Sequence, residues 1–350
     1  MLALLDMSSA FDCVNYKILL DRLFSMFGIA GDVLNWLETF VVGRSQEVCF
    51  LGKSSGTKPF TTGVPQGSVL GPLLFLVYIS PIFDEIEKFG LKCHGFADDL
   101  QLSISAKPLD VPNALNQFRN CMSTVNMWLG MNRLQLNQDK TRIMLVGTWQ
   151  QLSTIKLTSV SVCDMNITFS NHVSNLGFIL DSHMSMGPHI ALLIKSCSFQ
   201  LRQLRQVRKS LNKDNLAVLV HAFVHSRLDY CNSLLYGIAN KWLMKLQVVQ
   251  NQAAKLICGG MKFGHASPLL QQLHWLPVQK RVLFKLGVIV FKCLNDLAPQ
   301  YLSEKCKLSD PVTTNMQLRS VEQRKLFVRC RNLKTGFCGS RTAFLEWLTR

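Results

Sequence analysis

The sequence predicts an α+β domain over roughly residues 1–180, followed by an all-helical region from about residue 188. In the first part, short runs of alternating apolar and polar residues are mixed with apolar residues at helical spacing, and the expected strands do not alternate regularly with helices. In the second part, three successive stretches keep a helical period and are joined by short connections. We therefore expect an antiparallel-sheet core with packed helices, and then a helical bundle.

The distribution of charge supports the same division. The 350-residue chain has a formal net charge of +16, and 48% of its residues are hydrophobic. Residues 1–150 contain 12 Lys and Arg against 13 Asp and Glu, whereas residues 151–350 contain 26 against 9. This pattern predicts a near-neutral core domain followed by a region that faces a polyanion, with a generally basic soluble surface as the alternative. The twelve cysteines show no CxxC or zinc-site spacing, and neither a signal peptide nor a membrane span is visible, so we expect an intracellular protein.

The expected elements of the first part follow from periodicity and from turn residues. A buried strand runs directly into Asp6 without a preceding capping loop, so we expect the chain to begin within a domain. The expected helices cover residues 16–27, 33–41, roughly 68–87 and 111–129. The expected strands and turns cover residues 48–50, a turn at 52–56, a hairpin at 91–105, and strands at 143–146, 155–162 and 173–180.

The second part is expected to be helical up to about residue 294. Apolar stripes predict helices over residues 190–211, 214–224, 242–256 and 280–294, with Asp214 as the cap of the second. Beyond about residue 300 the periodicity fades and the tail is basic. These patterns predict three domains: 1–185, 186–265 and a C-terminal helical extension with a basic, partly irregular tail at 266–350.

Two adjacent carboxylates, Asp98 and Asp99, follow an apolar approach and precede an alternating run. They are expected in a tight turn between two strands. Like charges this close repel each other, and Mg²⁺ is a common partner for such a pair; an exposed polar turn is the alternative. If the strand ending at Asp6 lies in the same sheet, three carboxylates would meet, and three carboxylates can hold two Mg²⁺ ions.

Five segments together resemble conserved motifs A to E of reverse transcriptases from non-LTR (LINE-type, jockey-like) retrotransposons, and they occur in the family order. They are Leu4–Asp12, Gly63–Ser68, Phe96–Asp99, Leu134–Thr141 and Asn175–Gly177. Residues 227–232 and 274–277 also resemble C-terminal segments of these elements, so the resemblance covers about residues 1–300. It implies a right-hand polymerase palm followed by a thumb-like helical region, and RNA-directed DNA polymerase activity.

The resemblance implies a role for each matched position. Asp6, Asp98 and Asp99 would be catalytic and would coordinate two Mg²⁺ ions, with Mn²⁺ as a substitute. Lys140 would lie near the leaving pyrophosphate, although a solvated loop lysine is the alternative. Asp12 also matches the family pattern, but we interpret it as structural because it lies six residues beyond Asp6.

The nucleotide and the nucleic acid would be bound by further matched positions. Phe11 would be the gate under the sugar, with a core aromatic as the alternative, and Gln66 and Gly67 would line the incoming dNTP. Leu176 and Gly177 would grip the primer. A basic series on the helical region would hold the phosphates of the primer–template duplex, with a solvated helix face as the alternative. This series is Lys195, Arg202, Arg205, Arg208 and Lys209.

The implied partners are an RNA template, a DNA primer and dNTPs, within a ribonucleoprotein of the nucleus or cytoplasm and without a membrane. The family's fingers precede motif A, and we expect that this chain alone, without them, extends a primer poorly or not at all. Two other hypotheses remain open at this point. One is an inactive retroelement relic that only binds nucleic acid through its basic helices, and the other is a structural interaction protein that does not bind Mg²⁺.

Overall fold

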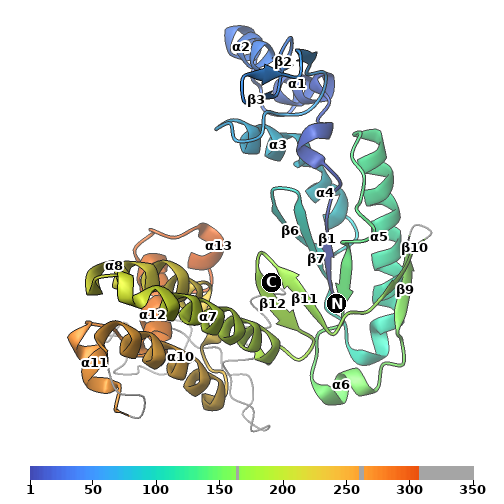
Figure 1. Ribbon diagram of the computed structural model, residues 1–350. Coiled ribbons are helices and arrows are strands. Elements are labelled where there is room, and N and C mark those ends of the chain that lie inside the picture. The colour runs from blue at the N-terminus through green and yellow to red at the C-terminus, as the bar shows by residue number, and fades with distance from the viewer. Residues whose placement is uncertain (163–164, 260–263, 307–350) are drawn as a thin grey trace. The chain divides into compact units, whose positions relative to one another are not determined.

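The computed structural model describes residues 1–162, 165–259 and 264–306 (Figure 1). The described residues form two compact units: the first contains those of 1–177 and 181–184, and the second contains those of 178–180 and 185–306. The first unit mixes strands with helices, and the described elements from residue 187 onward are helical. The predicted change from α+β to helical structure is therefore confirmed. The part of the expected basic tail from residue 307 onward lies outside the described residues.

An antiparallel four-stranded sheet forms the centre of the first unit, in the order β6-β7-β1-β8. Its strands are β1 (Leu2–Leu5), β6 (Lys92–Phe96), β7 (Asp99–Ser103) and β8 (Arg142–Met144). The alternation seen in the sequence corresponds to burial, since Leu5, Leu100 and Leu102 are each 1% exposed. The hairpin expected at 91–105 and the strand expected before Asp6 are thus both present.

Two helices, α4 (Pro81–Glu87) and α5 (Val111–Met131), pack on each other beside this sheet. The apolar stripe of α5 is buried as predicted, and Phe118 and Met122 share one core with the strand residues. The single helix expected over roughly 68–87 is wrong. The chain instead forms α3 (Gly71–Ile79) and then α4, because Pro81 has no N–H to continue the helical hydrogen bonds.

Helices α1 (Tyr16–Ser25), α2 (Gly31–Val41) and α3 lie beyond the end of β1 (Figure 1). A half-buried arginine on α1, Arg22, connects them to the core. The Arg22 guanidinium donates to the carbonyl of Tyr78 on α3 and to the Asn132 side chain after α5. It also lies over the rings of Tyr78 and Trp128, at 4.9 and 5.1 Å from their centroids. Carbonyl, amide and aromatic groups therefore surround this cation and stabilise it beside the core.

A long hairpin follows α2. Its outer pair is β2 (Ser45–Gln46) with β5 (Lys58–Pro59), and its inner pair is β3 (Cys49–Phe50) with β4 (Lys53–Ser54). The turn expected at 52–56 lies instead at Leu51 and Gly52, which both have positive φ and form a tight two-residue loop. Residues 42–59 are all exposed.

The remaining strands of the first part are short. β9 (Ser159–Val162) pairs with β10 (Met165–Thr168), and β11 (His172–Asn175) pairs with β12 (Phe178–Asp181). The sequence did not predict the short helix α6 (Trp149–Ser153), which begins with a capping box made by Thr148 and Gln151.

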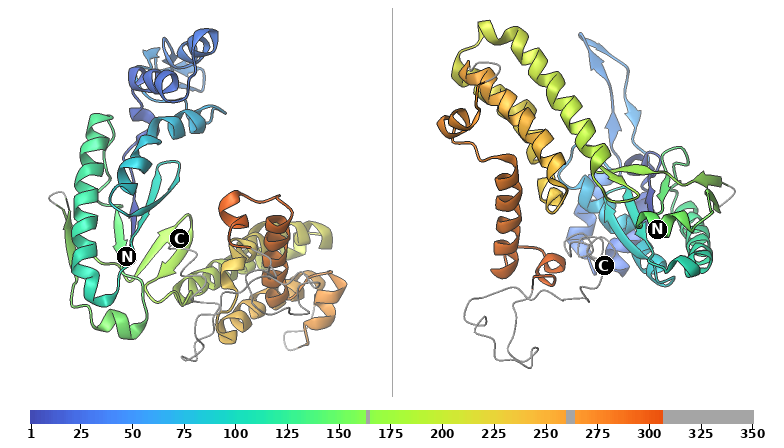
Figure 2. Two further views of the ribbon diagram at one scale, coloured as in Figure 1. Left: turned by 180° about the vertical axis from the view of Figure 1, so that it is seen from behind. Right: turned by 90° about the horizontal axis from the view of Figure 1, so that it is seen from below.

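The second unit contains the helices expected from periodicity, with different bounds (Figure 2). The expected helices are α7 (Gly187–Val207), α8 (Lys213–Val220), α10 (Asn240–Cys258) and α12 (Val278–Leu294). The sequence did not predict three short helices, α9 (Ser226–Asp229), α11 (Ser267–Gln272) and α13 (Gln300–Ser303). The cap of α8 is not Asp214 but Asn212, whose side chain accepts from the N–H of Asn215 at 2.8 Å. Residues 221–225 form a π-helical turn between α8 and α9.

Helices α7 and α10 lie side by side and run parallel. At their beginnings, Gly187 lies so near Trp242 that an added Cβ would be 3.1 Å from the ring. At their ends, Arg208 Nε donates to the carbonyl of Leu256 at 2.8 Å. Within the described residues, no helix is long and apolar enough to cross a membrane.

The segments 227–232 and 274–277 take part in holding α12 to the rest of the second unit. Asp229 forms an ion pair with Arg281 of α12, in which Arg281 Nε lies 2.8 Å from Asp229 Oδ1. The ring of Trp275 packs against His225 with their centroids 4.0 Å apart. Burial, then Arg281 and His221, lowers the pKa of His225 to about 4, so this ring is neutral at pH 7.

Candidate active site

The strand register brings the three predicted carboxylates to one edge of the sheet. Leu5 pairs with Leu100 across β1 and β7, so Asp6, the next residue, lies opposite Asp99. Asp98 occupies the two-residue loop that joins β6 to β7, since Phe96 pairs with Asp99. The predicted tight turn and the predicted strand neighbourhood are both present.

These carboxylates influence one another electrostatically. Partial desolvation raises the pKa of Asp99 above its usual value of 3.8, and repulsion from Asp98 and then Asp6 adds to the rise. Lys140 opposes the rise. The positive charge of Lys140 therefore offsets only part of the repulsion that Asp98 and Asp6 exert on the Asp99 carboxylate.

The loop that carries Lys140 is bound to the backbone that follows β1. Asn137 donates its N–H to the carbonyl of Asp6 at 2.8 Å, and Ser8 donates its N–H to the carbonyl of Gln135 at 2.9 Å. Lys140 Nζ thereby lies 3.4 Å from Asp6 Oδ2, while the lysine side chain stays 67% exposed. The predicted lysine is thus next to the carboxylates and accessible to a ligand.

A second loop, Gly63–Ser68, packs on the short 3₁₀ turn Ala10–Cys13. Gly63 has φ +90° and donates to the carbonyl of Val14 at 2.8 Å, and Val64 donates to the carbonyl of Phe11 at 2.9 Å. A Cβ on Gly63 would lie 2.8 Å from Asp12 Cα, so only glycine fits here. Backbone hydrogen bonds therefore join two predicted site segments, the one around Phe11 and the loop that begins at Gly63. Val14 and Gly63 are 49 residues apart in the sequence.

The side chains expected to bind the nucleotide are placed as follows. Phe11 stacks on the buried Phe75 with ring centroids 4.5 Å apart and is itself half-buried. Gln66 is exposed and donates from Nε2 to Asp12 Oδ1 at 3.1 Å. Gly67 is exposed with φ +80° and has open space around it. The sequence did not predict the contact between Gln66 and Asp12.

A divalent cation fits the chemistry of the carboxylate edge. Within the part of the chain that the structure describes, the buried Asp6 Oδ2 accepts no hydrogen bond, and the Lys140 ammonium lies 3.4 Å from it. Carboxylate oxygens are also the ligands that Mg²⁺ prefers. Within the described residues, however, no three His, Cys, Asp or Glu side chains lie close enough together to hold an ion between them.

The other predicted binding residues belong to other elements than the strands of the carboxylate edge. Leu176 and Gly177 both have positive φ and form the two-residue turn between β11 and β12. The five basic residues expected to hold phosphates are all exposed: Lys195, Arg202 and Arg205 on α7, and Arg208 and Lys209 on the 3₁₀ turn after it. Among them, Arg208 is also bonded to the carbonyl of Leu256 at the end of α10.

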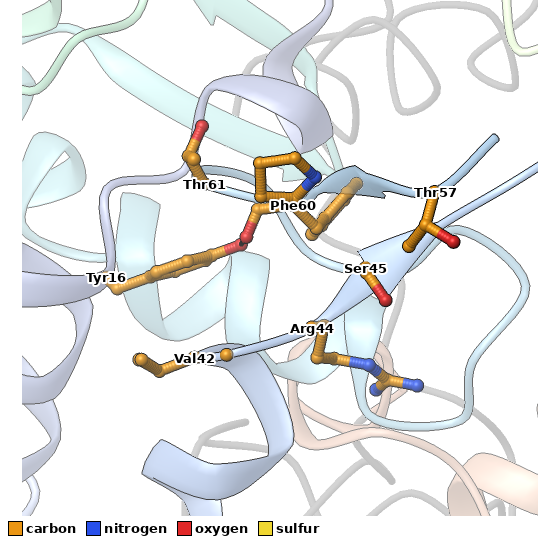
Figure 3. A pocket seen from close by; sticks show the side chains of 9 residues that line it. Tyr16, Val42, Arg44, Ser45, Thr57, Phe60 and Thr61 are labelled. Carbon is orange, nitrogen blue, oxygen red and sulfur yellow. Dashed lines mark hydrogen bonds between the residues drawn. The ribbon is translucent and has the colours of Figure 1, made fainter.

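A pocket of about 530 Å³ lies at the base of the exposed hairpin, where α1 meets β2 and β5 (Figure 3). Tyr16 closes one side and donates its hydroxyl to the carbonyl of Phe60 at 3.3 Å. Arg44 and the hydroxyls of Ser45 and Thr57 form the polar part of the lining. None of the residues expected to act in catalysis lines this pocket.

A family comparison covers the part of the chain that carries the carboxylates and the two loops. Residues 1–180 match the model of the family described as "Reverse transcriptase (RNA-dependent DNA polymerase)". The chain belongs to the reverse transcriptase family. Its first unit is therefore a polymerase fold of the reverse transcriptase type, built of sheets and helices.

The curated relatives of this reverse transcriptase chain include polymerases of fruit-fly transposons. It is 24% identical over 286 residues to the probable RNA-directed DNA polymerase from transposon BS of Drosophila melanogaster, covering 79% of this chain and 31% of that protein. It is 25% identical over 266 residues to the RNA-directed DNA polymerase from mobile element jockey of the same species, covering 73% and 28%. The resemblance to jockey-like polymerases is thus confirmed, and the chain spans less than a third of the length of these relatives.

Solved structures similar to this reverse transcriptase chain include telomerases. Telomerase from Candida albicans in complex with a TWJ fragment of telomeric RNA is 14% identical, with a TM-score of 0.36, and the match covers 87% of this chain and 50% of the telomerase. Apo telomerase from Candida tropicalis is 12% identical, with a TM-score of 0.41 and coverage of 74% and 42%. Likenesses of this size do not by themselves define a shared arrangement.

Proposed function

We propose that this chain is the palm and thumb-like part of a retrotransposon reverse transcriptase, which copies an RNA template by adding dNTPs to a DNA primer. One observation above all supports the proposal: the strand register brings Asp6, Asp98 and Asp99 to one sheet edge, beside Lys140. The primer 3′-oxygen would bond to the α-phosphorus while its proton passes to a base. The bond from the α-phosphorus to the bridging oxygen breaks, and pyrophosphate leaves.

Asp6, Asp98 and Asp99 would hold two Mg²⁺ ions, and Mn²⁺ is a possible substitute. When bound, such ions lower the pKa of the attacking hydroxyl and stabilise negative charge on the leaving oxygen. The chain itself supplies the anionic oxygens. Asp6 Oδ2 accepts no hydrogen bond, and the Asp99 carboxylate is repelled by Asp98 and Asp6. A cation would stabilise the negative charge on both side chains. The ions therefore have an electrostatic reason to bind at this edge.

The remaining site residues would act on the nucleotide. Lys140 is exposed at the carboxylate edge, so its ammonium can reach a pyrophosphate group and offer it a charge or a proton. Gln66 and Gly67 are exposed on the loop joined to the backbone of Phe11, and these three residues would contact the base and sugar of the dNTP.

The primer–template duplex would be held mainly by phosphate contacts, which carry no sequence readout. We assign these contacts to Leu176 and Gly177 and to the exposed cations Lys195, Arg202 and Arg205, with Arg208 and Lys209 after them. The net charge of +16 supports binding to a polyanion. Because the template is RNA, we also propose that the protein acts inside the cell in a ribonucleoprotein, in the nucleus or the cytoplasm.

The experiment combines Mg²⁺ titration calorimetry with primer extension on an RNA template. We expect the chain to bind Mg²⁺ and Asp6→Ala to weaken that binding, whereas Asp32→Ala, an exposed acid on α2, leaves it unchanged. Any extension should require Mg²⁺ and disappear in Asp98→Ala. If the wild-type chain shows no Mg²⁺ binding that depends on Asp6, the two-ion site is wrong. A chain that binds RNA–DNA hybrids but neither Mg²⁺ nor dNTPs would favour the inactive nucleic-acid binder.

A further inference from the structure

A single contact connects the nucleotide-binding loop to a carboxylate outside the proposed metal site. Gln66 Nε2 donates to Asp12 Oδ1 at 3.1 Å, and both side chains are exposed. A long, exposed glutamine has several rotamers of similar energy, and ordering such a side chain costs conformational entropy. A contact that selects one rotamer before the nucleotide arrives would remove part of that cost from binding.

The chemistry of the pair fixes which end of the amide faces Asp12. An ionised carboxylate only accepts hydrogen bonds, so the NH₂ group of Gln66 must point toward Asp12. The amide oxygen Oε1 is then turned the other way, together with the second N–H. The bond is charge-assisted, and such bonds are stronger than those between neutral groups.

The backbone on both sides of this contact is held independently of the two side chains. Thr62 Oγ1 donates to the main-chain carbonyl of Asp12 at 3.0 Å, and Gly63 donates to the carbonyl of Val14 at 2.8 Å. Pro65 has a fixed φ on one side of Gln66, and Gly67 has φ +80° on the other. Removing the Asp12 carboxylate therefore frees the Gln66 side chain while the loop stays in place.

We propose that Asp12 is a positioning residue that acts through Gln66: it orients the Gln66 amide so that Oε1 faces the incoming nucleotide. This inference rests on the proposed function, because it takes the nucleotide as the ligand of Gln66. It assigns Asp12 a role in dNTP affinity, although Asp12 belongs neither to the carboxylate edge nor to the metal ligands.

The experiment measures binding of N-methylanthraniloyl-dATP by fluorescence. The full chain is used with Mg²⁺ and an RNA template annealed to a dideoxy-terminated DNA primer. The variants are Asp12→Ala, Asp12→Asn, Gln66→Ala, the double variant Asp12→Ala/Gln66→Ala, and Asp32→Ala as a matched control. We expect Asp12→Ala to weaken binding roughly 5- to 10-fold, the scale of a charge-assisted hydrogen bond at an exposed site. Asp12→Asn keeps an acceptor oxygen and should retain most of the affinity.

The double variant separates positioning from a general structural role. If Asp12 acts through Gln66, Asp12→Ala has no further effect once Gln66 is alanine. An equal effect in both backgrounds, or none in either, overturns the proposal. Selective ¹⁵N labelling of glutamine gives a second readout, in which Asp12→Ala shifts the Gln66 side-chain amide signals and Asp32→Ala does not. Unchanged signals would also overturn it. If the wild type binds no nucleotide, the proposed function fails and this inference fails with it, and shifted amide signals would then show only a hydrogen bond between Asp12 and Gln66.

Discussion

The substitution Gly63→Ala tests the backbone junction between the two site loops. The added Cβ would lie 2.8 Å from Asp12 Cα and 2.9 Å from the carbonyl oxygens of Asp12 and Phe11. All of these are backbone atoms, so no side chain can rotate away. Overpacking of this kind costs about 1–3 kcal/mol. The φ of +90° adds about 1–2 kcal/mol for a residue with a Cβ. The free energy of unfolding should therefore fall by about 2–5 kcal/mol.

Thermal unfolding of the chain measures this change, and two other glycines are matched controls. In a unit of this size each kcal/mol corresponds to roughly 2–4 °C, so Gly63→Ala should lower the Tm of the first unit by about 4–20 °C. Gly67 has a similar φ of +80° but open space around it, so Gly67→Ala should cost only about 1 kcal/mol. Gly130 lies in α5 with open space, so Gly130→Ala should be neutral or stabilising.

Hydrogen exchange localises the effect. In Gly63→Ala, amides of residues 9–14 and 61–68 should exchange faster, because the bonds from Gly63 to Val14 and from Val64 to Phe11 are strained or lost. Equal Tm values for the Gly63 and Gly67 variants, with unchanged exchange, would refute the close backbone approach as the reason for glycine at position 63.

Other residues give further predictions. The pKa of Asp99 is raised, so its carboxyl group binds a proton more tightly in the folded chain than in the unfolded chain. Above the raised pKa the carboxylate is ionised and destabilises the fold. Without metal at pH 7, Asp99→Asn should therefore raise the Tm, and the gain should shrink as the pH falls toward 3.8; a lower Tm would contradict this. Lys140→Gln should raise the pKa of Asp99 further, measured by NMR titration, because Lys140 opposes the rise. Replacing Arg202 and Arg205 together with alanine should reduce the salt slope of RNA–DNA hybrid binding by about 2, without lowering the Tm. Arg208→Ala should weaken hybrid binding and also lower the Tm, since the Arg208 guanidinium donates to the carbonyl of Leu256 near the end of α10. An unchanged Tm would show that this hydrogen bond does not stabilise the fold.

The carboxylate edge could be predicted from the sequence because each of its parts has a local signature. The alternation after Asp99 fixed which side chains are buried, and two acids between strand patterns indicated a tight turn. The strand ending on Asp6 was recognisable for the same reason. Family resemblance supplied what local patterns do not contain, namely that these segments are neighbours in one sheet.

Contacts between distant segments could not be predicted, because no local pattern encodes them. The bond from Gln66 to Asp12 joins residues 54 positions apart, and Asp12 was interpreted as structural from its distance to Asp6 along the chain. The break at Ser80 was missed because the apolar run continues across Pro81, although the proline itself was visible. The cap of α8 was placed two residues late, since Asn212 and Asp214 are both good capping residues.

The exposed hairpin after α2 has a practical consequence. Its two ends are joined at its base, where Phe60 donates to the carbonyl of Arg44 at 2.8 Å and β2 pairs with β5. Everything between residues 45 and 59 is exposed, so this arm can be altered without repacking the core. The tip at Leu51 and Gly52 is therefore a suitable place to graft a fluorophore or an affinity epitope. A label at that tip would leave the carboxylates, the two site loops and the helices unchanged in sequence.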